Sequence, residues 1–226
     1  MIRSVLISNR GEIALRVIRA CRALDLRTVA VFSEADADAL HVRAADVAVS
    51  LGPAAPRESY LSIERVLEAA RRSGADAVHP GYGFLSENWR FAEACWAAGL
   101  TFVGPPPEVI RAMGNKTEAR RRMAAAGVPV LPGSEGPVAD AAAAGTVAER
   151  VGYPVMLKAV AGGGGIGMAL VPGADRLEST FGVARRRAES AFADGGVYIE
   201  RALDAPRHVE VQILADHHRP SGSLGS

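Results

Sequence analysis

The first half of the chain alternates between short apolar runs and longer amphipathic patterns. Apolar runs typical of strands occupy Ser4–Ile7, Thr28–Phe32, Val47–Val49, Ala77–His79 and Thr101–Val103. Helical patterns occupy Glu12–Leu24, Tyr60–Ser73 and Asn88–Ala98. Because the strand runs are continuously apolar, they favour a parallel sheet that helices cover on both faces. The pattern therefore predicts a doubly wound α/β domain over residues 1–113.

The order of the elements changes in the second half of the chain. A helix over Lys116–Ala126 stops at Gly127, with Pro129 close behind. From Val128 onward the residues predict a strand, a helix, two strands joined by glycines, a helix and two more strands. The predicted ranges include Val138–Val151, Met168–Val171, Ala174–Ala193, Val197–Glu200 and His208–Leu214. We therefore expect an α+β domain over residues 114–216 and a polar tail over residues 217–226.

Composition narrows the classes of function. The chain has 226 residues, of which 49% are hydrophobic and 23% charged, so it can bury a sizeable core. Its 26 basic and 25 acidic residues give a net charge of +1, so nucleic acid is not an expected partner. No apolar run is long enough for a membrane span and no secretory signal is evident, which predicts a cytoplasmic protein. Cys21 and Cys95 are expected to be free, buried thiols.

Residues 155–171, VMLKAVAGGGGIGMALV, carry the clearest chemical signal. Two strand patterns flank a glycine run whose backbone N–H groups can approach an anion closely, and Lys158 adds an ammonium charge nearby. Gly162, Gly164 and Gly167 match the spacing of a dinucleotide fingerprint, but Met168 begins a strand pattern rather than a helix. We therefore predict a phosphate-binding hairpin. An ordinary hairpin turn is the alternative, although such a turn needs fewer glycines.

Five ordered segments resemble the biotin carboxylase unit of biotin-dependent carboxylases, the enzymes of the acetyl-CoA, acyl-CoA and pyruvate carboxylase type. They read SNRGEIALRVIRACRALDLRTVAVFSEAD, HPGYGFLSEN, MGNKTEARRRMAAAGVPVLPGS, YPVMLKAVAGGGGIGM and PRHVEVQILAD. The resemblance implies an ATP-grasp ligase that uses MgATP and bicarbonate to carboxylate biotin on a carrier domain. It also implies a carboxyltransferase partner and allows a homodimer. The second domain would then be an incomplete ATP-grasp domain.

The same resemblance implies the site residues. The ATP-binding set consists of Lys116 and Lys158 at the phosphates, Gly163, Gly164 and Gly165 in the flap, Glu200, Arg201, Ala202 and Leu203 at adenine, and His208. His79, Tyr82 and Gly83 match the vicinity of bicarbonate and biotin. A structural role is the alternative for each residue, such as a solvated lysine or a rigid Gly/Pro turn. The run Asn9–Glu12 has a single glycine and is interpreted as structural.

Two positions depart from the family pattern. Asn115 stands where Asp is usual, and Ile166 stands where many members carry Arg or Lys. The resemblance places the acidic Mg²⁺ ligands, the bicarbonate-binding Lys and Arg, and the catalytic Glu beyond residue 226, so no metal ligand or catalytic residue is assigned. We therefore expect a truncated chain that does not turn over alone. A non-catalytic partner protein and an ATP-grasp ligase for carboxylate–amine coupling are the alternatives.

Overall fold

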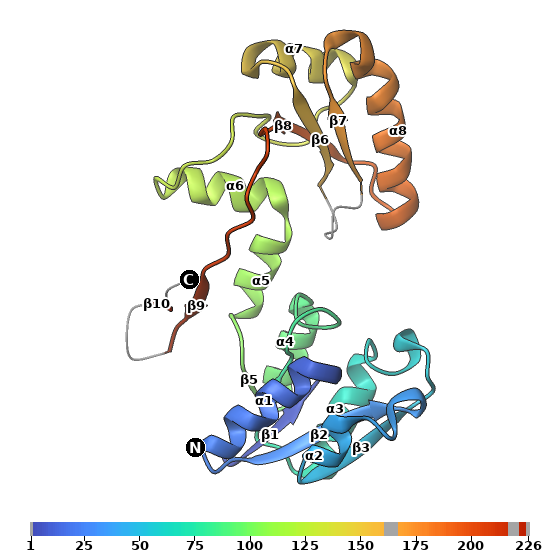
Figure 1. Cartoon of the computed structure of the whole chain (residues 1–226), viewed down its shortest axis with the longest axis vertical. Coiled ribbons are helices and arrows are strands. Elements are labelled where there is room, and N and C mark those ends of the chain that lie inside the picture. The colour runs from blue at the N-terminus through green and yellow to red at the C-terminus, as the bar shows by residue number, and fades with distance from the viewer. Residues whose placement is uncertain (1, 161–166, 217–221, 225–226) are drawn as a thin grey trace. The chain divides into compact units, whose positions relative to one another are not determined.

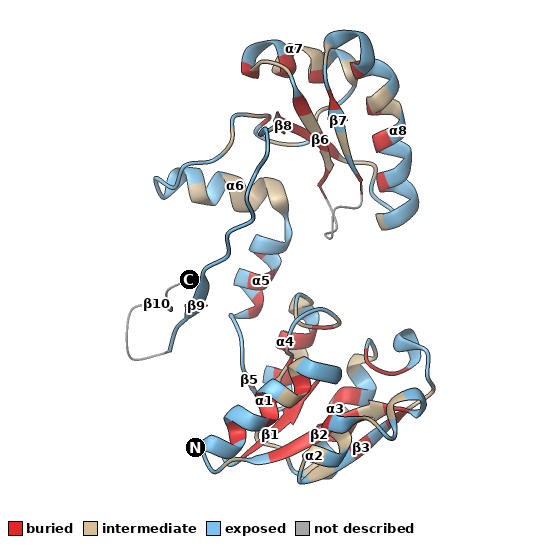
Figure 2. Ribbon diagram, in the orientation of Figure 1, coloured by how far each residue is buried: buried red, intermediate tan, exposed pale blue. Residues whose placement is uncertain are grey.

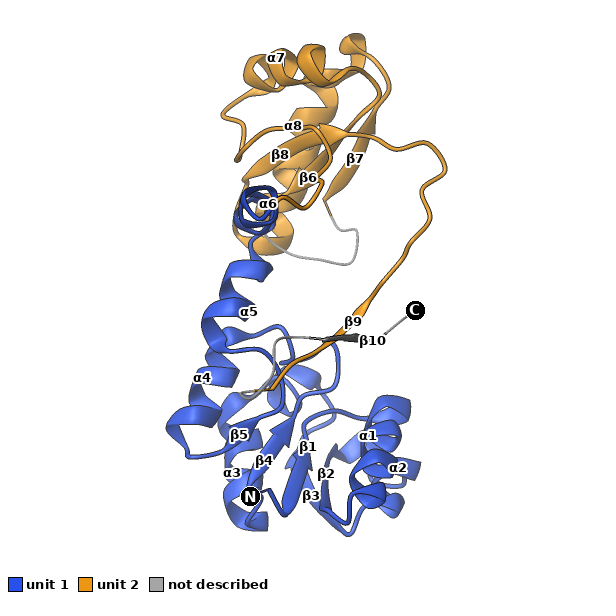
Figure 3. Ribbon diagram, turned by 90° about the vertical axis from the view of Figure 1, so that its left-hand side faces the viewer, with its two compact units in different colours: residues 1–126 blue, residues 127–226 orange. Residues whose placement is uncertain are grey.

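The computed structural model describes residues 2–160, 167–216 and 222–224 (Figure 1). These residues form two compact units, Met1–Ala126 and Gly127–Ser226, which Figure 3 shows in different colours. Each unit has its own buried apolar core. In the described part of the chain, no helix is long and apolar enough to cross a bilayer.

Unit 1 is built on a five-stranded sheet in which every strand pair is parallel. The order across the sheet is β3-β2-β1-β4-β5. The strands are β1 (Ser4–Ile7), β2 (Arg27–Ser33), β3 (Val47–Gly52), β4 (Ala77–His79) and β5 (Thr101–Phe102). The chain adds β2 and β3 on one side of β1 and then β4 and β5 on the other. The boundary between β1 and β4 is therefore the topological switch point of the sheet.

Both faces of this sheet are buried (Figure 2). Val5 and Ile7 of β1 pack with α1 (Gly11–Ala23) on one face. Leu6 packs on the opposite face, in the core that also contains α3 (Ile63–Ser73) and α4 (Trp89–Ala97). Successive strand residues point to opposite faces, so a strand that is apolar throughout must be covered twice. The prediction of a doubly wound parallel sheet is confirmed.

Two α-helices of unit 1 were not predicted from the sequence pattern. They are α2 (Leu40–Ala44) and α5 (Pro107–Gly114). The first is too short to show a helical period. The second begins at Pro107, which lacks an N–H group and therefore suits the first turn of a helix. Two 3₁₀ turns, η1 (Glu34–Asp36) and η2 (Pro56–Glu58), also belong to this unit. The predicted helix α6 (Lys116–Ala125) follows α5.

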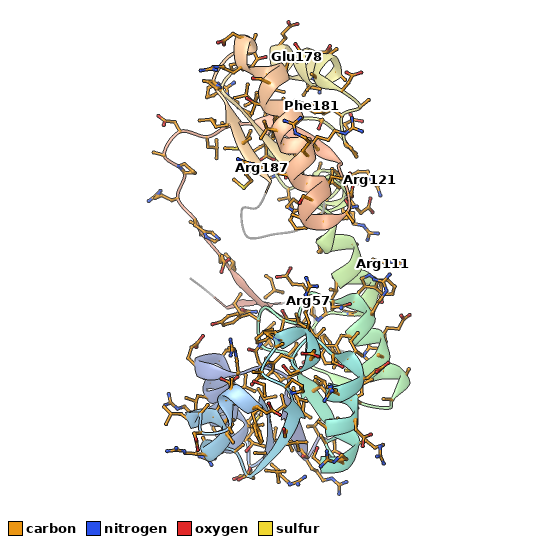
Figure 4. The ribbon with its side chains drawn as sticks, turned by 90° about the vertical axis from the view of Figure 1, so that its right-hand side faces the viewer. Arg57, Arg111, Arg121, Glu178, Phe181 and Arg187 are labelled. Carbon is orange, nitrogen blue, oxygen red and sulfur yellow. The ribbon has the colours of Figure 1, made fainter. Side chains whose placement is uncertain are left out.

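Unit 2 contains a three-stranded antiparallel sheet of order β7-β6-β8, with two helices packed against one face. Its elements are β6 (Val155–Ala159), β7 (Met168–Val171), β8 (Val197–Arg201), α7 (Ala141–Val151) and α8 (Ala174–Phe192). Leu157 and Ile199 of the sheet share a core with Phe181 of α8. Glu178 and Arg187 of the same helix are exposed (Figure 4). From α7 to β8, the predicted order of helices and strands is present.

The strand predicted at Val128 is wrong. This part of the chain instead follows the edge of β8, where the Ser134 N–H donates to Ile199 O at 2.8 Å. Gly133 forms only an isolated bridge with Glu200. The prolines at positions 129 and 132 have no N–H group, so a continuous ladder cannot form through them.

The strand predicted over His208–Leu214 is also mostly wrong. Only β9 (Gln212–Leu214) is a strand, and it pairs in antiparallel register with β10 (Gly222–Leu224). Val209 and Val211 alternate with polar residues as a strand requires, yet their exposed fractions are 72% and 51%. Apolar alternation specifies a strand only where a partner edge is available, and the described residues offer none to residues 208–211.

Candidate functional site

Lys158 and Glu200 form an ion pair on the face of the unit 2 sheet opposite its two helices. Strands β6 and β8 place Met156 directly across from Glu200, so Lys158 lies on the diagonal. The Lys158 Nζ contacts Glu200 Oε1, and only 24% and 6% of the two side chains are exposed. A carboxylate buried to this extent requires a cationic partner. The pair therefore holds an ammonium group near the point where β6 leads into the glycine run.

Apolar side chains lie beside this ion pair. Across β6 and β7, Met168 is opposite Lys158 and Leu170 is opposite Met156. Met168 and Leu170 are 44% and 54% exposed although both are large and apolar. Methionine adapts to irregular shapes because its side chain has three rotatable bonds. An open apolar surface beside a positive charge suits a ligand with a flat apolar ring and an anionic group.

The segment predicted to contact adenine, residues 200–203, begins in the last two residues of β8. The Arg201 N–H donates to Pro132 O at 2.8 Å, and the Ala202 N–H donates to Pro154 O at 3.0 Å. Both amides are thus engaged within the unit. Leu203 is 56% exposed. Ligand contacts from this segment would therefore come from carbonyl oxygens and from Leu203 rather than from the amides of Arg201 and Ala202.

The remaining predicted ATP-binding residues of unit 2 are the flap glycines and His208. Gly163, Gly164 and Gly165 lie outside the described residues, as does Ile166. His208 lies on the extended segment that precedes β9, with 83% of its side chain exposed, and its Nε2 lies 3.1 Å from Glu210 Oε1.

Lys116 is the first residue of α6 and belongs to unit 1. The preceding Asn115 caps this helix, because its Oδ1 accepts hydrogen bonds from the Glu118 N–H at 3.0 Å and from the Thr117 hydroxyl at 2.9 Å. Asn and Asp are about equally good as N-caps. The departure from Asp at position 115 therefore preserves the local structure that holds Lys116.

A second group of predicted site residues lies at the topological switch point of unit 1. The loop after β4 is fixed by Asn9, which follows β1 and is 3% exposed. The Asn9 Nδ2 donates to Pro80 O at 2.8 Å and to Tyr82 O at 2.7 Å. Gly81 has a φ of +64°, and a Cβ at this position would lie 2.8 Å from Asn9 Nδ2. Only glycine fits there, since a side chain would be both strained and in contact with Asn9.

His79 ends β4, and Tyr82 and Gly83 lie in the loop that follows it. The His79 Nδ1 accepts a 3.0 Å hydrogen bond from the Gly81 N–H, and burial lowers the pKa of His79, which favours the neutral imidazole at pH 7. Tyr82 is 61% exposed, and its hydroxyl donates to Glu12 of α1. That hydrogen bond raises the pKa of the Tyr82 phenol.

Asn9 and Glu12 contact the loop that carries the predicted site residues, although their sequence run was interpreted as structural. One signal could have found them: both follow a predicted strand of a doubly wound sheet. The order of the strands was missing, and only that order places the end of β1 beside the end of β4.

A groove of about 870 Å³ lies elsewhere on unit 1. Its lining includes Ile2, Leu100 and Thr101, which lie at the amino ends of β1 and β5. Ligands of doubly wound sheets bind at the carboxyl ends of the strands. The loops around Asn9 and Tyr82, and not this groove, are therefore the candidate site of unit 1.

The described residues do not fit a Mg²⁺ site of their own. Among them, no group of three or more His, Cys, Asp or Glu side chains is placed to hold a metal ion. Mg²⁺ requires several oxygen ligands, and the carboxylate of Glu200 is already paired with Lys158.

Two family profiles match the chain. One, described as "Biotin carboxylase, N-terminal domain", covers residues 1–110, and the other, described as "Carbamoyl-phosphate synthase L chain, ATP binding domain", covers residues 115–221. A biotin carboxylase of Halalkalibacterium halodurans is 55% identical over 218 residues, which are 96% of this chain and 48% of that protein. Biotin carboxylase 2 of Bacillus subtilis is 52% identical over 96% of this chain and 49% of that protein. The chain thus spans about half the length of the curated relatives it matches.

Solved structures agree with these matches. A biotin carboxylase from Campylobacter jejuni, described as a β-γ-ATP complex, superposes with a TM-score of 0.94 at 45% identity, over 99% of this chain and 50% of that one. The biotin carboxylase domain dimer of the Hydrogenobacter thermophilus 2-oxoglutarate carboxylase, in complex with MgADP, ADP and bicarbonate, gives 0.93 at 43% identity. The match covers 100% of this chain and 49% of that one.

Proposed function

Because the chain belongs to the biotin carboxylase family, of whose curated members it spans about half, we propose that it forms the nucleotide-binding N-terminal half of a biotin carboxylase. Such an enzyme uses ATP and bicarbonate to carboxylate biotin on a carrier domain, and a carboxyltransferase then uses the product. We place this reaction in the cytoplasm and expect a homodimer. The observation that carries the proposal is the Lys158–Glu200 pair beside the open apolar face of Met168 and Leu170.

The chemistry of that face suits a nucleotide. An ammonium group is a compact charge that can follow phosphate oxygens as they move, and glycine amides next to it can approach the same anion. The apolar surface offers a place for the base. Glu200 keeps Lys158 on this face, since β6 and β8 fix both backbones. The nucleotides in the two relatives' structures support the same assignment.

The distribution of basic residues gives independent support. Of the 26 basic residues in the chain, only two are lysines, Lys116 and Lys158. Both occupy positions that resemble the phosphate-contacting lysines of the family. Every other cation is an arginine, whose planar guanidinium is not interchangeable with an ammonium at a phosphate site. A chain that otherwise uses arginine has lysine at the two positions where a mobile point charge is needed.

The loop of unit 1 suits the bicarbonate and biotin side of the reaction. His79 is half-buried and Tyr82 is exposed at a switch point, where small ligands usually bind. Bound Mg²⁺ would neutralise phosphate charge during the reaction. The described residues supply no site for it, so no step is assigned through the metal.

The two lysines allow a direct test. An amine-reactive reagent can label only Lys116, Lys158 and the N-terminal amine, and peptide mass spectrometry separates the three positions. We expect MgADP to protect Lys158 from labelling, and Lys158→Arg to weaken MgADP binding in calorimetry by about tenfold or more, although the charge is kept. Arg176→Lys, on an exposed part of α8, is the matched control and should bind normally. Equal affinity in Lys158→Arg, with no protection by nucleotide, would refute the proposed site.

A further inference from the structure

Four side chains near the candidate loop of unit 1 form a closed cluster. The Arg10 Nη1 lies 3.1 Å from Asp36 Oδ2, and the Arg10 Cζ lies 5.6 Å from the Tyr60 ring centroid and 5.7 Å from that of Phe84. The two rings stack on each other with centroids 5.0 Å apart and planes 16° apart. We call Arg10, Asp36, Tyr60 and Phe84 the Arg10 clamp. These four residues come from four different segments of the chain.

Hydrogen bonds hold Tyr60 and Asp36 of the Arg10 clamp in place. The Tyr60 hydroxyl donates to Asp36 Oδ2 at 2.7 Å and accepts from the Ser33 N–H at 3.0 Å, and the whole residue is 1% exposed. Burial and the neighbouring Asp36 carboxylate raise the pKa of Tyr60 to about 12, so the hydroxyl remains a donor at pH 7. Burial pushes the pKa of Asp36 upward, but hydrogen bonds from Tyr60 and Arg10 outweigh it, and the net shift is downward. The carboxylate therefore stays charged opposite Arg10.

The fourth member of the clamp has a strained backbone. Phe84 has a φ of +43°, in the left-handed region that residues with a side chain rarely adopt. Gly81 and Gly83, just before it, have φ values of +64° and +66°. Strain of this kind persists only where the surroundings fix the conformation, and it is concentrated at functional sites. Here the surroundings are the Tyr60 ring and the Arg10 guanidinium, which hold the Phe84 ring.

Two members of the Arg10 clamp are connected to the proposed ligand contacts Tyr82 and Gly83. Phe84 directly follows Tyr82 and Gly83 in the chain. Arg10 immediately precedes α1, whose Glu12 accepts the hydrogen bond from the Tyr82 hydroxyl. One guanidinium thus connects the end of β1 to the loop after β4, on opposite sides of the switch point.

We propose that the Arg10 clamp is a positioning device that holds Tyr82 and Gly83 in the geometry needed for the bicarbonate and biotin side of the reaction. None of its four residues is assigned a contact with a ligand. The inference rests on the proposed function, because Tyr82 and Gly83 owe their ligand role to it. The flat guanidinium of Arg10 can contact both rings and pair with the Asp36 carboxylate at the same time, whereas a lysine ammonium is a compact point charge.

Amide hydrogen exchange of the whole chain, without any ligand, tests the clamp. In Arg10→Lys the charge remains but the planar group is lost, and we expect the amides of residues 81–84 to exchange about tenfold faster or more. The amides of Val29 and Val31, in the central sheet, should be unchanged. Arg16→Lys, at an exposed position of α1, is the matched control. Unchanged exchange in the loop, or equal acceleration in the sheet, would overturn the proposal.

Two further readouts separate positioning from general stabilisation. Tyr60→Phe keeps the ring stack and should restore most of the loop protection that Tyr60→Leu loses. In Arg10→Lys, the pKa of Tyr82 should fall toward the ordinary value of about 10, because the released loop gives up the hydrogen bond to Glu12. A Tyr82 pKa that stays raised while the chain is destabilised would show a merely structural role. Since no ligand is used, failure of nucleotide binding would refute the proposed function and leave this result intact.

Discussion

Replacement of Asn9 tests how the candidate loop of unit 1 is held. Asn9 is 3% exposed, and its side chain makes three hydrogen bonds, to Pro80 O at 2.8 Å, to Tyr82 O at 2.7 Å and from the Arg10 N–H at 2.9 Å. Each such bond contributes about 1 kcal/mol net to stability. Asn9→Ala removes all three, so we expect the free energy of unfolding to fall by about 3 kcal/mol.

Asn9→Asp isolates the two donated hydrogen bonds. The substitution keeps the size of the side chain and the acceptor for Arg10, but it directs a carboxylate at the carbonyl oxygens of Pro80 and Tyr82. An uncompensated buried charge costs more than a missing amide, so at pH 7 Asn9→Asp should be less stable than Asn9→Ala by about 1 kcal/mol or more. The folded-state pKa of the new carboxyl should lie above its unfolded value of about 3.9. The additional loss should therefore vanish below about pH 4 and grow as pH rises through the folded pKa.

Urea denaturation followed by tryptophan fluorescence measures these differences. Both tryptophans, Trp89 and Trp96, lie on α4, so the signal reports the unit that contains Asn9. Asn88→Asp is the matched control, because Asn88 caps α4 and Asp caps equally well, and its stability should stay within about 0.5 kcal/mol. If Asn9→Asp were as stable as the parent chain at pH 7, or more stable than Asn9→Ala, the Asn9 amide would not be the group that holds the loop.

Activity, acid stability and amide exchange provide three more tests. A polypeptide of residues 1–226 should show no bicarbonate-stimulated release of phosphate from MgATP, because its described residues offer no metal-binding cluster; a stimulated rate that Lys158→Arg abolishes would contradict this. Burial lowers the pKa of His41, so below about pH 6.5 the unfolded chain binds a proton that the folded chain excludes, and stability should fall there. His41→Gln should flatten that slope in urea titrations at successive pH values. Amides of Val209 and Val211 should exchange about a thousandfold faster than that of Val29, and equal protection in a monomer would show that they are paired.

The sequence by itself determined the elements whose signal is local. Continuous apolar runs identified the five strands of the parallel sheet, and burial on both faces is the physical reason for that pattern. The glycine run and Lys158 also identified one candidate site, because few functions other than phosphate binding require several consecutive glycines next to a lysine. The local pattern did not predict α5, because this helix begins at a proline. It wrongly predicted a strand at residues 208–211, because the alternating apolar residues there have no partner strand among the described residues.

Only the tertiary structure decided which distant residues meet. Lys158 and Glu200 are 42 positions apart, and the antiparallel register of β6 and β8 makes them a pair. Asn9 reaches Pro80 and Tyr82 across more than 70 positions because β1 and β4 are neighbours in the sheet. Strand order arises from how whole helices and strands bury their apolar faces together, which no short window of sequence contains. The contacts that hold the candidate loop therefore became visible only in the folded chain.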